Sequence, residues 1–100
     1  NQNKYDQAAA LYQRILRVDP HNDKAKWDLS QIYLRQRKIE AALSLLKNLR
    51  AQQKGASAEK VDIKIGLIYF NQKKYRAAIR IFSRLLKKHP ENNRIAYYLG

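Results

Sequence analysis

The sequence predicts an all-α fold in which antiparallel helix pairs stack against one another. Apolar and aromatic residues recur at helical spacing along almost the whole chain, and they nowhere alternate for long, as strands would require. The stretch YDQAAALYQRILRVDP at residues 5–20 returns in modified form as YRAAIRIFSRLLKKHP at residues 75–90. A fixed offset of this kind is typical of repeat architectures, whose units bury their apolar faces by stacking on their neighbours.

The helix boundaries follow from the residues that interrupt this pattern. Pro20 and Pro90 each end a helix, because proline cannot continue a helix and restricts the residue before it. Asn22 and Asp23 are expected to cap the helix that follows Pro20. We expect helices at about residues 5–18, 23–36, 39–51, 58–70 and 75–88, with a sixth beginning near Asn93.

The stretch QQKGAS at residues 52–57 is predicted to be a loop between the third and fourth helices. Gly55 suits the C-terminal cap of the third helix, and Ser57 suits the N-terminal cap of the fourth.

Small and large residues recur at equivalent positions of successive helices. Ala8 aligns with Ala42 and Ala78, at offsets of 34 and then 36 residues. The two extra residues fall in the 52–57 loop, where an insertion is tolerated. Two helices approach closely only where one offers a small residue and the other a large one. Further columns are Tyr12, Leu46 and Phe82; Leu29, Ile65 and Leu99; and Ser30, Gly66 and Gly100.

A helix–turn–helix unit of 34 residues with these columns resembles the tetratricopeptide repeat (TPR) family. The positions of the family's Leu-Gly-Tyr triplet hold Leu29, Ser30 and Tyr33, and then Ile65, Gly66 and Tyr69. The departures are Lys26 and Asp62 at the usual Trp, Ile15, Leu49 and Leu85 at the usual second small residue, and Lys54 at the middle Pro.

The resemblance implies a right-handed superhelical solenoid made of four pieces. Residues 23–56 and 57–92 would be full repeats, the second with the two-residue insertion. Residues 1–22 would be the second helix of an incomplete repeat, and residues 93–100 the first helix of a truncated one.

The composition limits the class of protein. The chain carries a formal net charge of +13 at pH 7 and has no Cys, which excludes disulfides and thiolate metal sites. No apolar run approaches the roughly 20 residues that span a bilayer, so we expect a soluble chain whose compartment is not indicated. Because it has no Met, we expect the chain to be an internal fragment of a larger TPR protein. Copies are expected to associate end to end, or to swap terminal helices, through exposed apolar residues at the two ends: Leu11, Ile15, Ile95 and Leu99.

The resemblance implies a non-catalytic scaffold that holds a protein segment, acidic or mixed apolar and acidic, in a concave groove. Trp27 is the clearest indication, because aromatic area beside long cations is typical of an interaction hot spot. Lys24, Lys60 and Arg94 recur at one position and would pair with carboxylates. The groove positions are Lys24, Trp27, Asp28, Gln31, Leu34 and Arg35, then Lys60, Ile63, Lys64, Leu67, Phe70 and Asn71, and finally Arg94, Tyr97 and Tyr98.

Two other interpretations of these residues stay open. The alternative for Trp27 is that it packs against the neighbouring helix. The alternative for Lys24, Lys60 and Arg94 is that they are solvated surface charges. The two-carboxylate clamp by which family members hold chaperone tails is not expected, because Asp28 and Gln31 do not fit its Asn-containing half.

A basic stripe on the outward face of the fifth helix offers an alternative function. It would bind nucleic-acid phosphates or an anionic membrane surface electrostatically. The competing interpretation is a solvated face or a contact with the rest of the parent protein, since the sequence shows no RNA-reading motif and no stacking platform beside it. The stripe consists of Arg76, Arg80, Arg84, Lys87 and Lys88.

The sequence contains no constellation typical of an enzyme. His21 and His89 fall in equivalent turns about two repeats apart, so they cannot share a metal ion. Neither a Gly-rich phosphate loop nor a Ser–His–Asp arrangement is present. Glu40 and Glu59 stand near helix starts, where the helix dipole alone accounts for them. We therefore expect no catalysis, no cofactor and no metal.

Overall fold

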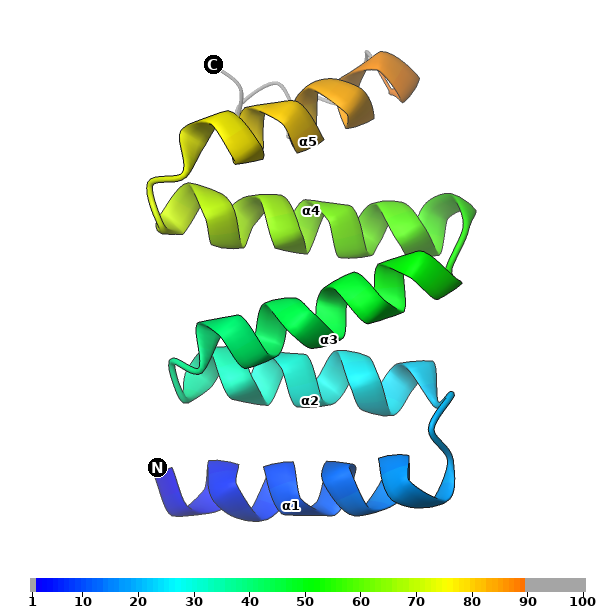
Figure 1. Ribbon diagram of the computed structural model, residues 1–100, viewed down its shortest axis with the longest axis vertical. Helices are drawn as coiled ribbons and strands as arrows, with labels where there is room; N and C mark the ends of the chain where they lie inside the picture. The colour runs from blue at the N-terminus through cyan, green and yellow to red at the C-terminus, as the bar shows by residue number, and fades with distance from the viewer. Residues whose placement is uncertain (1, 90–100) are drawn as a thin grey trace. The chain divides into compact units, whose positions relative to one another are not determined.

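The computed structural model describes residues 2–89, and these residues form five α-helices joined by short turns (Figure 1). The expected sixth helix lies outside the described residues. No helix within residues 2–89 has both the length and the apolar character that a membrane crossing requires. The helices are α1 (Gln2–Val18), α2 (Asp23–Arg35), α3 (Ile39–Gln52), α4 (Gly55–Asn71) and α5 (Tyr75–Lys88).

The chain divides into two compact units, residues 1–52 and residues 53–100. In the first unit α2 lies between α1 and α3 and packs against both. In the second unit α4 packs against α5. Consecutive helices within each unit run antiparallel (Figure 1), as predicted for helix–turn–helix repeats.

The core of the first unit is formed where small residues let the helices approach. Ala42 is fully buried, which confirms its predicted role at a close helix contact. Ala8, the residue aligned with it, is only half-buried, and Ala9 is buried instead. In the described structure α1 packs only against α2, and the buried alanine of α1 is Ala9 rather than the predicted Ala8. The other buried apolar residues of this unit are Ala25, Leu29, Leu43, Leu46 and Leu49.

The second unit contains a close helix contact at Gly66. A Cβ added to Gly66 on α4 would lie 2.8 Å from the Phe82 ring on α5, which is itself fully buried. Only glycine therefore permits this approach. The equivalent residues of the first unit are Ser30 and Leu46, where the smaller Leu replaces the ring and a side chain is tolerated.

The turns within the two helix pairs share one geometry. Arg37 and Lys73 have positive φ angles of 60° and 62°, a left-handed conformation that residues with a Cβ adopt at a cost of about 1–2 kcal/mol. The next residue in each turn donates its backbone N–H to a tyrosine carbonyl, from Lys38 to Tyr33 and from Lys74 to Tyr69, both at 2.8 Å. Each of these lysines also places its ammonium 5.9 Å from the centroid of the same tyrosine's ring.

The caps confirm one prediction and correct another. Asn22 is the N-cap of α2, and its side-chain oxygen accepts a hydrogen bond of 2.9 Å from the Ala25 N–H. The loop predicted for residues 52–57 is shorter than expected, because α4 already begins at Gly55. Gly55 has a φ of +67°, but it starts α4 rather than capping α3, and Ser57 lies inside the helix.

Candidate functional site

The groove residues predicted in the first unit lie on α2. Lys24 and Arg35 are exposed at its two ends. The other predicted groove residues of α2 are half-buried. Their three- and four-residue spacing places them on one side of the helix: Trp27, Asp28, Gln31 and Leu34.

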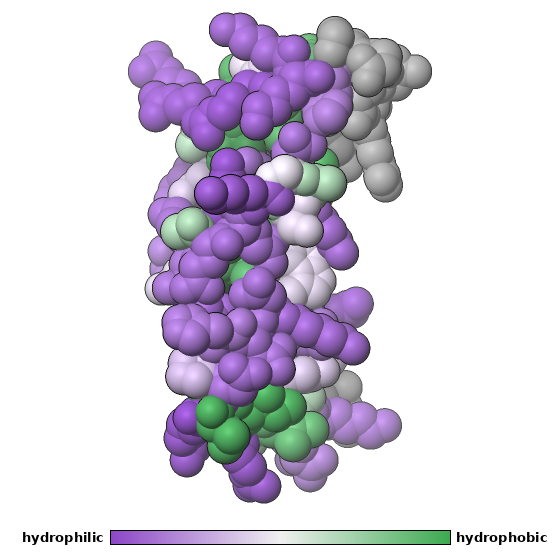
Figure 2. All heavy atoms as spheres, turned by 90° about the vertical axis from the view of Figure 1, so that its right-hand side faces the viewer, coloured by the Kyte–Doolittle hydropathy of each residue, from purple (hydrophilic) through white to green (hydrophobic). Residues whose placement is uncertain are grey.

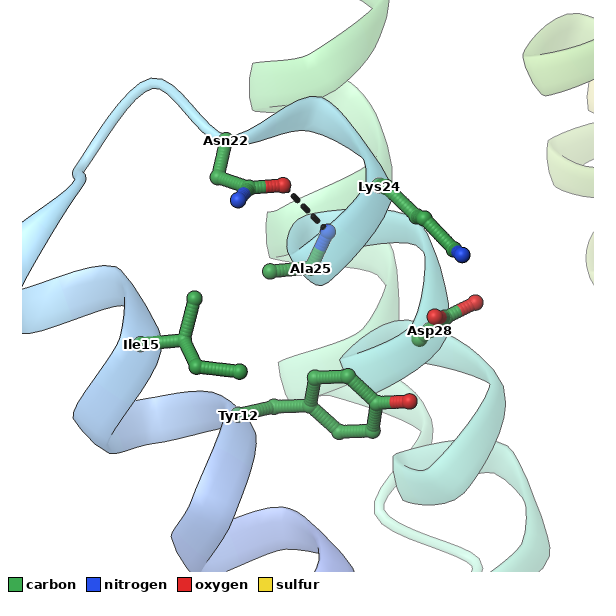
Figure 3. A pocket seen from close by; sticks show the side chains of 6 residues that line it. All are labelled: Tyr12, Ile15, Asn22, Lys24, Ala25 and Asp28. Carbon is green, nitrogen blue, oxygen red and sulfur yellow. Dashed lines mark hydrogen bonds between the residues drawn. The ribbon is translucent and has the colours of Figure 1, made fainter.

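A pocket of about 210 Å³ opens where this side of α2 meets α1 (Figure 3). Tyr12 and Ile15 reach it from α1, and Lys24 and Asp28 from α2. The remaining lining residues are Asn22 and Ala25. Two predicted groove residues, Lys24 and Asp28, are thus brought together with two residues of α1 that the sequence analysis did not assign to a site.

Asn22 holds the start of α2 in place at the edge of this pocket. Its capping bond to the Ala25 N–H fixes the first turn of the helix, from which Lys24 extends (Figure 3). The position of the Lys24 side chain therefore depends on an N-cap that the sequence predicts.

Tyr12 and Asp28 interact across the pocket. A hydrogen bond to the Asp28 carboxylate raises the pKa of the Tyr12 hydroxyl above its ordinary value, with further contributions from burial and from the Asp28 charge. The hydroxyl therefore keeps its proton, which it donates to the Asp28 carboxylate. Sequence reasoning missed this role because Tyr12 aligns with the core residues Leu46 and Phe82.

The pocket combines charge with apolar area on a small scale. Lys24 offers an ammonium and Asp28 a carboxylate, beside the aliphatic carbons of Ile15 and Ala25. Its volume of about 210 Å³ lies below the roughly 300–1,000 Å³ of typical small-molecule sites. The pocket is therefore suited to one side chain of a larger ligand rather than to a complete cofactor.

Lys26 is buried in the first unit, although the sequence analysis treats it only as a departure from the family pattern. It is 6% exposed, and its ammonium donates to the Asn48 and Gln52 side-chain oxygens, both at 2.9 Å. All three residues lie between α2 and α3, so this polar cluster joins the two helices of one repeat. It is a structural feature and is no part of the pocket.

The groove residues predicted in the second unit lie on α4. Lys60, Phe70 and Asn71 are exposed and Lys64 is half-buried. Ile63 and Leu67 pack against the core formed by α5, so much of their surface is used within the unit. The predicted residues Arg94, Tyr97 and Tyr98 lie outside the described part of the chain.

All five residues of the predicted basic stripe are exposed on α5. At the start of this helix, Tyr75 contacts Phe70 edge to face, with ring centroids 5.5 Å apart and planes at 73°. Both rings are also exposed, at 49% and 40%. The sequence analysis found no aromatic platform beside the stripe, and the structure shows an exposed aromatic pair at the start of α5, where the stripe begins.

The histidines do not form a metal site in the described structure. His89 lies 2.7 Å from the Glu59 carboxylate, so this acid has a partner in addition to the helix dipole. His21 is exposed in the turn before α2. Over residues 2–89, no group of three or more His, Cys, Asp or Glu side chains could hold a metal ion.

Comparison with known proteins agrees with the repeat pattern. A tetratricopeptide repeat model matches residues 1–61, and a second model of the same description matches residues 62–92. The chain is also 30% identical over 88 residues to the RNA polymerase-associated protein CTR9 of Saccharomyces cerevisiae. That match covers 88% of this chain but only 8% of the yeast protein. The repeat columns, the antiparallel helix pairs and the two family matches together show that this chain belongs to the tetratricopeptide repeat family.

Proposed function

We propose that this chain is a protein-interaction scaffold whose α2 surface holds an acidic, partly apolar segment of a partner protein. Lys24 would pair with a partner carboxylate, and the pocket beside it would receive an apolar or polar side chain. Trp27 and Gln31, on the same side of α2, would extend the contact along the helix. The exposed α4 residues Lys60 and Phe70 would provide an equivalent surface in the second unit.

The observation that carries this proposal is the composition of the pocket between α1 and α2. An exposed ammonium stands there beside the apolar carbons of Ile15 and Ala25, and the Asp28 carboxylate in the same pocket is bonded to the Tyr12 hydroxyl. Charge-assisted bonds combined with a small apolar recess favour a mixed acidic and apolar ligand over a purely acidic one. Half-buried side chains also lose less freedom on binding than fully solvated ones, which favours docking.

The family and the yeast relative support the same class of function. Tetratricopeptide repeats generally act as scaffolds for protein partners, and the relative is described as RNA polymerase-associated. By analogy, the partner of this chain would also be a protein. The enzyme class is disfavoured for this part of the chain, because its site offers a salt-bridging ammonium and a hydrogen-bonded tyrosine but no activated nucleophile.

A binding assay with defined peptides tests the proposal. Fluorescein-labelled peptides of equal length would carry Asp and Glu alone, Asp and Glu mixed with Leu and Phe, or neutral residues alone, and fluorescence anisotropy would measure affinity. We expect the mixed peptide to bind best. Charge reversal in Lys24→Glu should weaken that binding about tenfold, because it replaces an attraction by a repulsion at the pocket.

The matched control is Lys54→Glu, which changes the net charge equally at an exposed position between α3 and α4. It should leave the affinity for the mixed peptide nearly unchanged. Equal losses in the two variants, or equal affinity for the mixed and purely acidic peptides, would show that net charge rather than the pocket governs binding.

A further inference from the structure

We infer that the exposed side of α5 is a binding site for single-stranded nucleic acid, separate from the pocket on α2. The first observation is charge. Five Lys and Arg side chains lie exposed on this one helix, which contains no acidic residue. No Asp or Glu occurs anywhere in residues 63–90. Hydrophilic side chains accordingly cover α5 in Figure 2. We call this set the α5 cationic face: Arg76, Arg80, Arg84, Lys87 and Lys88.

Nothing within the described chain neutralises the α5 cationic face. None of its five side chains forms an ion pair or a hydrogen bond with another described residue. The acidic side chains of the second unit's described residues are engaged elsewhere, because Glu59 lies against His89 and Asp62 has an interaction of its own. Within residues 2–89 no acidic side chain therefore compensates this charge.

The spacing of these cations suits a chain of phosphates. Arg76, Arg80 and Arg84 follow one another at four-residue intervals, which are steps of about 6 Å along one side of a helix. From Arg76 to Lys88 the face extends over about 18 Å and offers five cations, each of which can pair with one phosphate. Each guanidinium group can also donate two parallel hydrogen bonds to the oxygens of one phosphate, which gives the contact a defined geometry.

The second observation is the aromatic pair at the start of the helix. Phe70 and Tyr75 expose 40% and 49% of their surface, and Arg76 follows directly in sequence. Exposed rings beside a row of cations are the combination by which proteins bind unpaired bases, because every base has a face that stacks. In a duplex the bases are already stacked on each other, so this pair favours a single strand.

The same geometry disfavours the other anionic partners. An interfacial membrane helix inserts its apolar face into lipid. In α5 most of the apolar side is occupied, because Ala78, Phe82 and Leu85 are buried in the contact with α4, and Ile79 is the one aliphatic residue of this helix that is largely exposed. An acidic protein would use the cations, but its anchoring side chains are held in pockets rather than on two exposed rings.

The test is the salt dependence of binding to a fluorescein-labelled 20-nucleotide oligothymidine, measured by anisotropy. With five phosphate contacts, the logarithm of affinity should fall with the logarithm of salt concentration with a slope of about −3.5. The variant Arg76→Gln/Arg80→Gln/Arg84→Gln should weaken binding and reduce the magnitude of this slope by about 2. In Phe70→Leu/Tyr75→Leu, affinity should fall about tenfold while the slope stays unchanged, because stacking releases no counterions.

The control variant Arg14→Gln/Arg17→Gln/Lys54→Gln removes the same charge from other exposed positions and should keep the wild-type slope. All substitutions are at exposed sites, and circular dichroism would verify that each variant stays helical. The inference is overturned if wild type does not bind at low salt, or if the control loses as much slope as the arginine variant. It is also overturned if polyglutamate of equal charge, or vesicles containing phosphatidylserine, displace the oligonucleotide as well as unlabelled oligothymidine does.

Discussion

Lys26 shows how a single buried residue departs from its family without loss of the fold. Lysine is almost never fully buried unless it is paired, and here the partners are two neutral amide oxygens from α3. A buried cation must recover its lost hydration through such bonds, and the recovery is seldom complete. The cluster therefore holds α2 against α3 with a defined geometry but contributes little net stability.

Removing the amide acceptors and removing the Lys26 ammonium should affect the free energy of unfolding differently. In Asn48→Ala/Gln52→Ala the ammonium stays buried without these acceptors, so we expect a loss of about 2–3 kcal/mol in the free energy of unfolding. In Lys26→Met the charge is gone and the half-exposed amides can bond to water, so stability should be unchanged or higher. Urea denaturation followed by circular dichroism measures both. A larger loss in Lys26→Met than in the double variant would contradict this account.

At the scale of the helix pair, the contact between Gly66 and Phe82 sets the distance between α4 and α5. The equivalent residues in the first repeat, Ser30 and Leu46, show a second solution with a larger residue on one helix and a smaller one on the other. The two repeats thus satisfy one packing requirement with complementary pairs.

Substitution of Gly66 alone should destabilise the fold, whereas substitution of Gly66 and Phe82 together should be tolerated. We expect Gly66→Ser to destabilise the chain by about 1–3 kcal/mol, because the buried Phe82 ring cannot move away. The variant Gly66→Ser/Phe82→Leu should recover most of this loss, since it copies the pair of the first repeat. Thermal unfolding of the two variants beside Phe82→Leu alone separates these effects; no recovery in the double variant would mean that the repeats are not equivalent here.

Most of the helices could be predicted from the sequence, and the errors have physical reasons. The bounds of α5 are as predicted, and those of α2 and α3 agree within one residue at each end, because prolines, caps and turns mark them. Helix α4 begins three residues earlier than predicted, since Gly55 uses its positive φ to start this helix instead of ending α3.

The candidate site was only half predictable. The family resemblance placed Lys24 and Asp28 on the groove side of α2, whereas Tyr12 was aligned with the core residues Leu46 and Phe82 and Ile15 was expected at an exposed apolar end. Tyr12 lies instead on the side of α1 that meets α2, where it is half-buried at the pocket and interacts with Asp28. The Phe70–Tyr75 pair was missed for a related reason, since contacts across a turn do not follow helical spacing.

For the molecule as a whole, the apolar surface on α1 predicts self-association. Leu11 is 54% exposed and Val18 is 85% exposed, and their seven-residue spacing places them on one side of the helix. The exposure of Leu11 was predicted, whereas Ile15 is half-buried at the pocket. Figure 2 shows an apolar patch over α1, in contrast to the hydrophilic surface over α5.

We expect copies of the chain to associate at millimolar concentration through this surface, because burial of exposed apolar area stabilises the contact. The variant Leu11→Gln/Val18→Gln should shift the equilibrium toward monomer, while Ala10→Gln, at an exposed position on another side of α1, should not. Sedimentation equilibrium measures both. A wild-type chain that stays monomeric at millimolar concentration would rule out association through this surface.

The single tryptophan has a spectroscopic consequence. Trp27 lies on α2 in the first compact unit, and the chain has no other tryptophan. Its emission therefore reports the environment of α2, whereas the far-ultraviolet ellipticity sums over all helices. Repeat units are stabilised largely by their nearest neighbours, so the two need not unfold together. Any difference between the two melting curves would measure directly how strongly one repeat depends on the next.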